Sequence, residues 1–475
     1  MDQPQEKPRR TWPPFLLLLF VLLALYLSNL RVIASSDTVP SRYLPLNIVL
    51  HGNFYLDTWA PKYLKADYPV GPYCLAMSRR GHLMSAYPII MPVVLTPLYV
   101  LPAWWLHRQP PVLGPVARAL VVETMEKVSA ALMAALSAGI LFLALRKVAD
   151  SQISLLVSAI YGAASETWVI SSQALWRHGF TELALALLLW ALLRDPQSRG
   201  YGFWVGLSLA MAAANNPLYM SVVLIFLLCF VLQARARFWE VLLPLVILGG
   251  LVLAYNLYFF GSIYGGYFKT LQTTGTAHYV RYKEDHPLWE GLLGLFISPS
   301  RGLLVYMPWA LFCLWGAVRF WRENRFFWSR YLLLSLAAVI LVHASYGGWW
   351  AGWCYGPRYF TDVTPFLAFL LIPVWPVFRA RSLMRMAMGV AVAIALWVQM
   401  LGAYQYRVGI WDGVPNDVNY HQERLWDWTD TQIAQCWAGG MLDTVLDDRW
   451  SFYFEVKNIL ARRGLIPSKS SSPRR

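Results

Sequence analysis

Long apolar runs recur along this chain, separated by short loops. The first covers residues 12–33, and several later runs approach or exceed about 18 residues, close to what a helix needs to cross the hydrocarbon core of a bilayer. Hydrophobic residues make up 57% of the 475 residues and charged residues only 14%, which is too little charge for a soluble protein of this length. The sequence therefore predicts an all-α fold, a polytopic transmembrane helical bundle.

The loops between the runs predict the topology. Ten later runs lie near residues 128–145, 153–170, 180–193, 201–214, 218–233, 239–260, 302–318, 331–345, 364–378 and 386–404. Arginine and lysine gather in the loops at residues 146–147, 194–199, 235–237, 319–330 and 379–385. Because cytoplasmic loops carry an excess of these residues, we expect these loops and the basic residues 1–10 inside, with about eleven spans and the C-terminus outside. The net charge of +14 then reflects topology and does not indicate nucleic-acid binding.

The apolar segment 86–106 conflicts with this topology if it spans the membrane. If it crossed the bilayer, every later basic loop would move to the outer side. It also contains Pro88, Pro92, Pro97 and Pro102, each of which removes a backbone donor and kinks a helix. We therefore expect this segment to lie in or dip into the outer leaflet.

This topology places most unusual polar residues on the outer side. We expect a large first outer loop at residues 35–127 carrying interfacial helices, followed by outer segments at 171–179, 261–301 and 346–362. Residues 1–405 then form a transmembrane domain, and residues 406–475 form a non-cytoplasmic C-terminal tail. The five cysteines show no metal-ligand spacing, so no metal site is expected.

Asp37 follows the first apolar run directly, in the stretch ASSDTVP. A carboxylate held at a helix exit beneath a large loop can act as a base on a substrate presented from the lipid. A helix cap or a solvated helix end would place an aspartate at the same position. Arg42 follows in the same loop and is a candidate cation for an anionic substrate.

The connection QALWRHGFTE at residues 173–182 joins two apolar runs on the outer side. A turn between helices does not require Arg177, His178 and Glu182, and ionisable side chains at a lipid boundary lose solvation. We therefore expect a functional role here. His178 and Glu182 are four residues apart, which predicts that they face the same groove.

Two further segments carry cations on the outer side. Arg301 precedes a run in SPSRG, against the general charge rule. The stretch YGGWWAGWCYGPRY at 346–359 supplies the remaining substrate-binding candidates, Trp349, Trp350, Arg358 and Tyr359. Aromatic faces suit sugar rings, glycine allows close backbone approach, and an arginine can hold a phosphate.

In their order along the chain, the motifs SSDT, WRHG, SPSRGLLVYMP and GGWWAGWCYGPRY resemble the integral-membrane glycosyltransferases of the GT-C superfamily. These enzymes are related to the protein O-mannosyltransferases and the aminoarabinose transferases. The resemblance covers most of residues 12–405. It implies a GT-C-like multi-span enzyme that uses a polyprenyl-phosphate-linked sugar on the non-cytoplasmic face.

The resemblance also implies roles for individual residues. An acid in the first outer loop is the catalytic base of such enzymes, and Asp37 matches it. A second acid from the next outer loop is usual too, and Glu182 is its nearest match. Many members carry two adjacent acids in the first loop, whereas this chain has Ser36 before Asp37. The expected partners are the lipid-linked sugar donor, a glycan, lipid or protein acceptor, and the bilayer, with no cofactor. The expected location is a bacterial inner membrane, with the site on the periplasmic or extracellular side.

Two other classes of protein are also compatible with the sequence. A membrane transporter or lipid flippase for a lipid-linked or anionic substrate would also carry outer cations, although such proteins often show internal repeats, and we find none here. A structural or receptor-like membrane protein would not need so many cations at helix ends. An inverting glycosyltransferase is therefore the preferred hypothesis.

Overall fold

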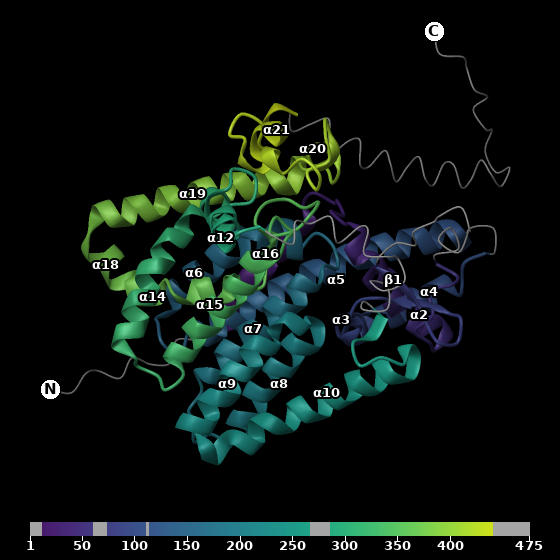
Figure 1. Cartoon of the computed structure of the whole chain (residues 1–475), viewed down its shortest axis with the longest axis horizontal. Helices are drawn as coiled ribbons and strands as arrows, with labels where there is room; N and C mark the ends of the chain where they lie inside the picture. Colours follow the sequence, from purple (N-terminus) through teal and green to yellow (C-terminus); the bar gives the residue numbers. More distant parts are fainter. Residues whose placement is uncertain (1–11, 60–73, 111–113, 267–285, 440–475) are drawn as a thin grey trace, which may run out of the picture.

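The computed structural model of the protein describes residues 12–59, 74–110, 114–266 and 286–439 (Figure 1). This part of the chain is mostly helical, and its strands form one antiparallel hairpin, β1 (Leu75–Met77) with β2 (Leu83–Ser85). The predicted all-α class is therefore confirmed. Residues 1–10, expected in the cytoplasm, and residues 440–475 of the expected C-terminal tail lie outside the described residues.

The helices follow one another along the whole described chain. They are α1 (Trp12–Leu27), α2 (Val39–His51), α3 (Ile90–Leu95), α4 (Val100–Leu106), α5 (Gly114–Leu145), α6 (Ser151–Ala163), α7 (Arg177–Leu192), α8 (Tyr201–Asn215), α9 (Met220–Gln233), α10 (Phe238–Phe260), α12 (Leu288–Ile297), α13 (Leu303–Tyr306), α14 (Leu311–Glu323), α15 (Ser329–Ser345), α16 (Arg358–Thr361), α17 (Thr364–Phe369), α18 (Trp375–Ala380), α19 (Ser382–Gln405), α20 (Ile410–Gly413) and α21 (Gln432–Ala438). A π-helical turn, Thr167–Ser171, stands between α6 and α7.

Three helices in the described part of the chain are long and apolar enough to cross a membrane, rather than the eleven expected. They are Val116–Leu145, Arg235–Phe260 and Ser382–Gln405, and they are compatible with a membrane protein. Most other expected runs form apolar helices of 10–17 residues. Proline accounts for part of the difference: Pro373 and Pro376 divide the run 364–378 into α17, a 3₁₀ turn and α18, because proline cannot continue the helical hydrogen bonding.

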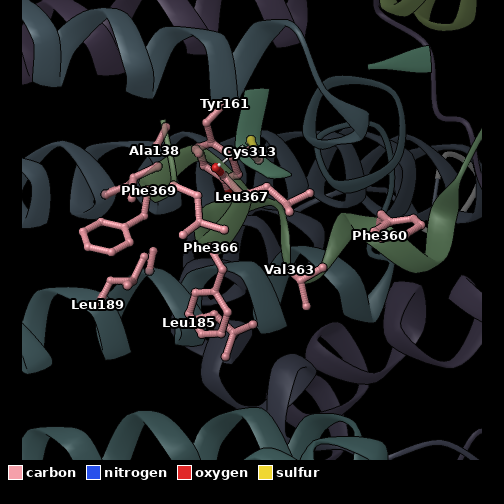
Figure 2. Close-up of a cluster of buried hydrophobic side chains, with 14 of the residues drawn as sticks. Ala138, Tyr161, Leu185, Leu189, Cys313, Phe360, Val363, Phe366, Leu367 and Phe369 are labelled. Atoms are coloured by element: carbon pink, nitrogen blue, oxygen red, sulfur yellow. Dashed lines mark hydrogen bonds between the residues drawn. The ribbon is translucent and has the colours of Figure 1, made fainter. Parts of the chain in front are cut away.

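The core of the bundle lies around α5 and α7. α5 contributes small buried side chains such as Ala131, Ala134 and Ala138, which allow neighbouring helices to approach closely. Figure 2 shows aromatic residues of α17 packed onto α7, with Phe366 beside Leu185. This contact matters for function because it fixes the segment containing α16 and α17 against the helix that begins at Arg177.

The described parts of the segment expected as the first outer loop form a lobe beside the bundle, shown at the right of Figure 1 with α2, α3, α4 and β1. Segment 86–106 does not form one continuous helix, because a 3₁₀ turn (Thr96–Tyr99) separates α3 from α4. Its exposed side chains are apolar, and Leu101 is 75% exposed. The carboxyl end of α10 reaches this lobe, where the Arg79 amide donates to the Phe259 carbonyl at 2.7 Å.

Candidate active site

Asp37 lies in a turn between α1 and α2. The Ser35 hydroxyl accepts a hydrogen bond from the Asp37 amide at 3.2 Å, which begins a short 3₁₀ turn (Ser36–Thr38) that leads into α2. Pro40 follows near the start of α2, where its missing N–H has no helical partner to lose. The backbone amide of Asp37 is thus the capped group, and its carboxylate points elsewhere.

The Asp37 carboxylate forms an ion pair with Arg358 at the start of α16. Arg358 Nη1 lies 2.9 Å from Asp37 Oδ2, and the two side chains are 11% and 20% exposed, respectively. The hydroxyl of Tyr87 donates to the other carboxylate oxygen at 2.7 Å. The predicted base, Asp37, and the predicted phosphate ligand, Arg358, are therefore in direct contact.

The WRHG motif at the start of α7 supports both members of this pair. The Arg358 guanidinium lies over the Trp176 ring, with its carbon 4.9 Å from the ring centroid. The Arg177 guanidinium lies over the Tyr87 ring at 5.0 Å. The Trp176 indole also donates to the Ile33 carbonyl at 2.9 Å, so the same motif holds the segment just before Asp37. These contacts fix the ion pair between α1, α7 and α16.

A second acid at this site is Asp362, which sequence reasoning missed. His178 Nδ1 lies 2.6 Å from Asp362 Oδ1, and both side chains are buried. The Asn216 amide donates to Asp362 Oδ2 at 3.3 Å. Burial alone would raise the pKa of Asp362, but the charge of His178 and its hydrogen bond lower that pKa below the ordinary value. Asp362 follows Arg358 by four residues in the segment 346–362, and this spacing is the one sequence signal that could have identified it.

Tyr359 lies beside this acid–histidine pair. Its ring stacks near the imidazole of His343 in α15, with centroids 4.2 Å apart. The structure thus brings together five of the predicted site residues, Asp37, Arg177, His178, Arg358 and Tyr359. Tyr87, Trp176, Asp362 and His343 join them.

Glu182 occupies a different place from the one expected. It lies fully buried one turn further along α7 than His178, and the hydroxyl of Thr167 donates to its Oε1 at 2.5 Å. Its described contacts are with the π-helical turn and not with Asp37. His178 and Glu182 therefore share a side of α7 but have separate partners.

Arg42 forms an ion pair with Glu126 of α5. The Leu175 amide also donates to this carboxylate, at 3.4 Å. Glu126 is fully buried, so the pair joins α2 and the chain before α7 to the long central helix. In this arrangement Arg42 neutralises a buried charge and connects elements of the fold.

Arg301, Trp349 and Trp350 lie in the interior. Arg301 is 1% exposed, and it donates to the carbonyls of Trp350 at 2.8 Å and Gly352 at 3.0 Å. It also pairs with Asp412 at 2.9 Å. Both tryptophans are 1% exposed, so neither offers an open face to a sugar ring. Arg301 thus holds the loop before Arg358, and the two tryptophans form the buried part of that loop.

No group of three or more histidine, cysteine, aspartate or glutamate side chains in the described ranges is arranged to hold a metal ion. Comparison with protein-family models and with curated proteins finds no match for this chain. The geometry around Asp37 and Arg358 is therefore the main indication of function.

Proposed function

We propose that this protein is an inverting membrane glycosyltransferase. It would move a sugar from a polyprenyl-phosphate donor to an acceptor hydroxyl on the non-cytoplasmic membrane face. In this proposal the shorter apolar helices also lie in the membrane, in a GT-C-like arrangement of about eleven spans. The observation that carries the proposal is the ion pair between Asp37 and Arg358, a carboxylate and a guanidinium on one partly exposed site.

Arg358 is suited to bind the phosphate of the donor. A guanidinium presents a planar set of donors that matches two phosphate oxygens, and stacking on an aromatic ring fixes its plane. Trp176 supplies that ring. A phosphate that binds Arg358 competes directly with Asp37 for the same guanidinium. Donor binding would therefore release the carboxylate when the substrate arrives.

The released Asp37 carboxylate would act as general base. It would take the proton of the acceptor hydroxyl while that oxygen forms a bond to the anomeric carbon of the sugar. The bond from this carbon to the phosphate oxygen breaks, and its electron pair leaves on the lipid phosphate. A single displacement of this kind inverts the anomeric centre. Arg358, with Arg177 nearby, would stabilise the negative charge that grows on the phosphate.

Tyr87 and the pair formed by His178 and Asp362 complete the arrangement. The Tyr87 hydroxyl, 2.7 Å from Asp37, would keep the carboxylate oriented once Arg358 turns to the phosphate. Asp362 holds the imidazole of His178 through Nδ1, which leaves the other ring nitrogen for substrate.

The exit of α1, the start of α7 and the start of α16 would lie at the outer membrane surface, and a bacterial inner membrane would suit this location.

The test is transfer of radiolabelled sugar from synthetic polyprenyl-phosphate donors by the purified protein in lipid nanodiscs. We expect a covalent product with wild-type protein and none above background with Asp37→Asn. Glu423→Gln is the matched control, because Glu423 is an exposed carboxylate (72%) that contacts only His421 among the described ion pairs. Movement of labelled lipid across vesicles without any covalent product would instead favour the transporter or flippase.

A further inference from the structure

The described part of the C-terminal segment folds over the loop at residues 346–357, which leads to Arg358. We call residues 406–438, which include α20 and α21, the C-terminal cover; it lies at the top of Figure 1 above α12 and α16. Its contacts with the loop include two tryptophan indoles. Trp350 donates to Asn419 at 3.0 Å, and Trp353 donates to Asp417 at 3.0 Å. The cover therefore contacts the loop directly.

Gln432, the first residue of α21, is the innermost contact of the cover. Its side chain is fully buried, and its Nε2 donates to the Cys354 carbonyl at 2.8 Å and to Asp412 at 3.2 Å. Its Oε1 accepts from the Gly356 amide at 3.1 Å and from the Tyr306 hydroxyl at 3.1 Å. A side-chain amide offers two donors and two acceptor sites, and all are used here.

The two backbone groups that Gln432 binds stand four and two residues before Arg358. The opposite side of this loop is also occupied. Gly356 has φ +57°, and a Cβ there would lie 2.5 Å from Glu166 Oε1 and 2.7 Å from a Tyr306 ring carbon. Glu166 and Tyr306 therefore pack closely against the Gly356 backbone, and Gln432 binds its amide. Pro357 then fixes the backbone angle of the one residue that separates Gly356 from Arg358.

Arg301 and Asp412 fix the same cover to the preceding part of the loop. Arg301 donates to the carbonyls of Trp350 and Gly352 and pairs with Asp412. The Tyr406 hydroxyl donates to the other oxygen of Asp412 at 2.6 Å. Arg301, Asp412 and Tyr406 are buried, and a lost partner leaves an unsatisfied polar group in the interior. The loop, the cover and Arg301 thus form one hydrogen-bonded unit.

We propose that Gln432 is a positioning residue for Arg358, which joins the C-terminal cover to the binding of the donor phosphate. By bridging the Cys354 carbonyl and the Gly356 amide, it sets the place of the Arg358 backbone and the reach of the guanidinium toward the site. This inference rests on the proposed function, since the phosphate ligand is the donor described there. A residue that only stabilised the fold would have no selective effect on phosphate binding.

The experiment compares Gln432→Met with Gln435→Met in the full-length protein. Methionine keeps the length of the side chain and removes its amide, and Gln435 is an exposed glutamine on the same helix. The first measurement is hydrogen–deuterium exchange of peptides covering 350–362. We expect exchange at least about tenfold faster in Gln432→Met, because the Gly356 amide loses its acceptor, and no change in Gln435→Met.

The second measurement is the dissociation constant of a polyprenyl phosphate. We expect binding about tenfold weaker in Gln432→Met, an effect equivalent to one or two lost hydrogen bonds, with turnover at saturating donor within about twofold of wild type. Combination with Arg358→Lys should weaken binding no further than Arg358→Lys alone, because both changes act on one group. If Gln432→Met does not fold, Asn419→Leu, which frees only the Trp350 indole, should show both effects in smaller measure.

Each outcome decides the inference. Unchanged exchange in Gln432→Met overturns it, whatever the transfer assay shows. Faster exchange with unchanged binding also overturns it, provided that Arg358→Lys weakens binding. If Arg358→Lys itself leaves phosphate binding unchanged, the proposed donor site fails, and the exchange measurement alone decides whether Gln432 holds the loop.

Discussion

Asp37 and Arg358 are separated by 321 positions in the sequence, and their charged atoms lie 2.9 Å apart. The ion pair joins the turn after α1 to the start of α16. The ion pair is partly exposed, whereas the pair of Arg301 and Asp412 is buried in the interior. If the pair opens for the proposed donor, substitutions of Asp37 and Arg358 should change activity rather than folding.

Asp37→Asn should abolish most transfer without unfolding the protein. Asparagine keeps the size of the side chain and the hydrogen bond from Tyr87, but its amide cannot take the acceptor proton at neutral pH. We expect turnover to fall by at least about 100-fold, the range of a lost general base. The measurement is radiolabelled transfer beside a thermal melt. Turnover near that of wild type would exclude Asp37 as the base.

Arg358→Lys should weaken donor binding in a protein that still folds. Lysine keeps the charge but loses the planar pair of donors and the stacking on Trp176. We expect at least about tenfold weaker binding of a polyprenyl phosphate, measured by titration in nanodiscs. Arg379→Lys is the control, since Arg379 is a 61% exposed arginine with an ordinary surface ion pair. Equal binding by both variants would leave Arg358 as a structural residue.

Asp362→Asn should slow transfer more than it weakens donor binding. The change removes the negative charge opposite His178, so the imidazole loses the group that orients it. We expect turnover to fall by at least about tenfold, because small misplacements of catalytic groups have effects of this size. Donor affinity should stay within about threefold of wild type if Arg358 is the main phosphate ligand. The reverse pattern would show that Asp362 acts on the donor site.

Gly206→Ala should destabilise the packing of α8 against α10. A Cβ at Gly206 would lie 2.1 Å from the Val241 carbonyl oxygen, so the two helices would have to separate. Gly249→Ala on α10 is the control, because a Cβ at that position would meet no atom within 4 Å. We expect Gly206→Ala to cost about 1–3 kcal/mol, the usual range for overpacking, and Gly249→Ala to be neutral or slightly stabilising. Thermal melts in detergent compare the two.

Labelling of single cysteines should test the predicted topology. Introduced cysteines at exposed positions of segment 35–127 should react with an impermeant reagent only from outside. Those in the loop 319–330 should react only from inside. Labelling of the second loop from outside would contradict the charge-based topology and the single-face site that depends on it.

The sequence by itself determined the helical class, because low charge and repeated apolar runs leave few alternatives. It also located the turn containing Asp37, the WRHG motif and the segment containing Arg358, because ionisable groups next to apolar runs stand out against their surroundings. It did not determine helix length. The run 364–378 is apolar in sequence and is expected as one span, yet its prolines divide it into short helices.

Only the tertiary structure decided which of these residues meet. Whether a buried arginine binds a ligand or a carbonyl depends on what lies opposite it, and the sequence carries no such information. Arg301 and Arg358 are both cations next to apolar runs in segments expected outside, but Arg301 faces Asp412 in the interior and Arg358 faces Asp37 at a partly open site. The same reason separates Glu182, enclosed beside Thr167, from Asp362, which binds His178 next to the site.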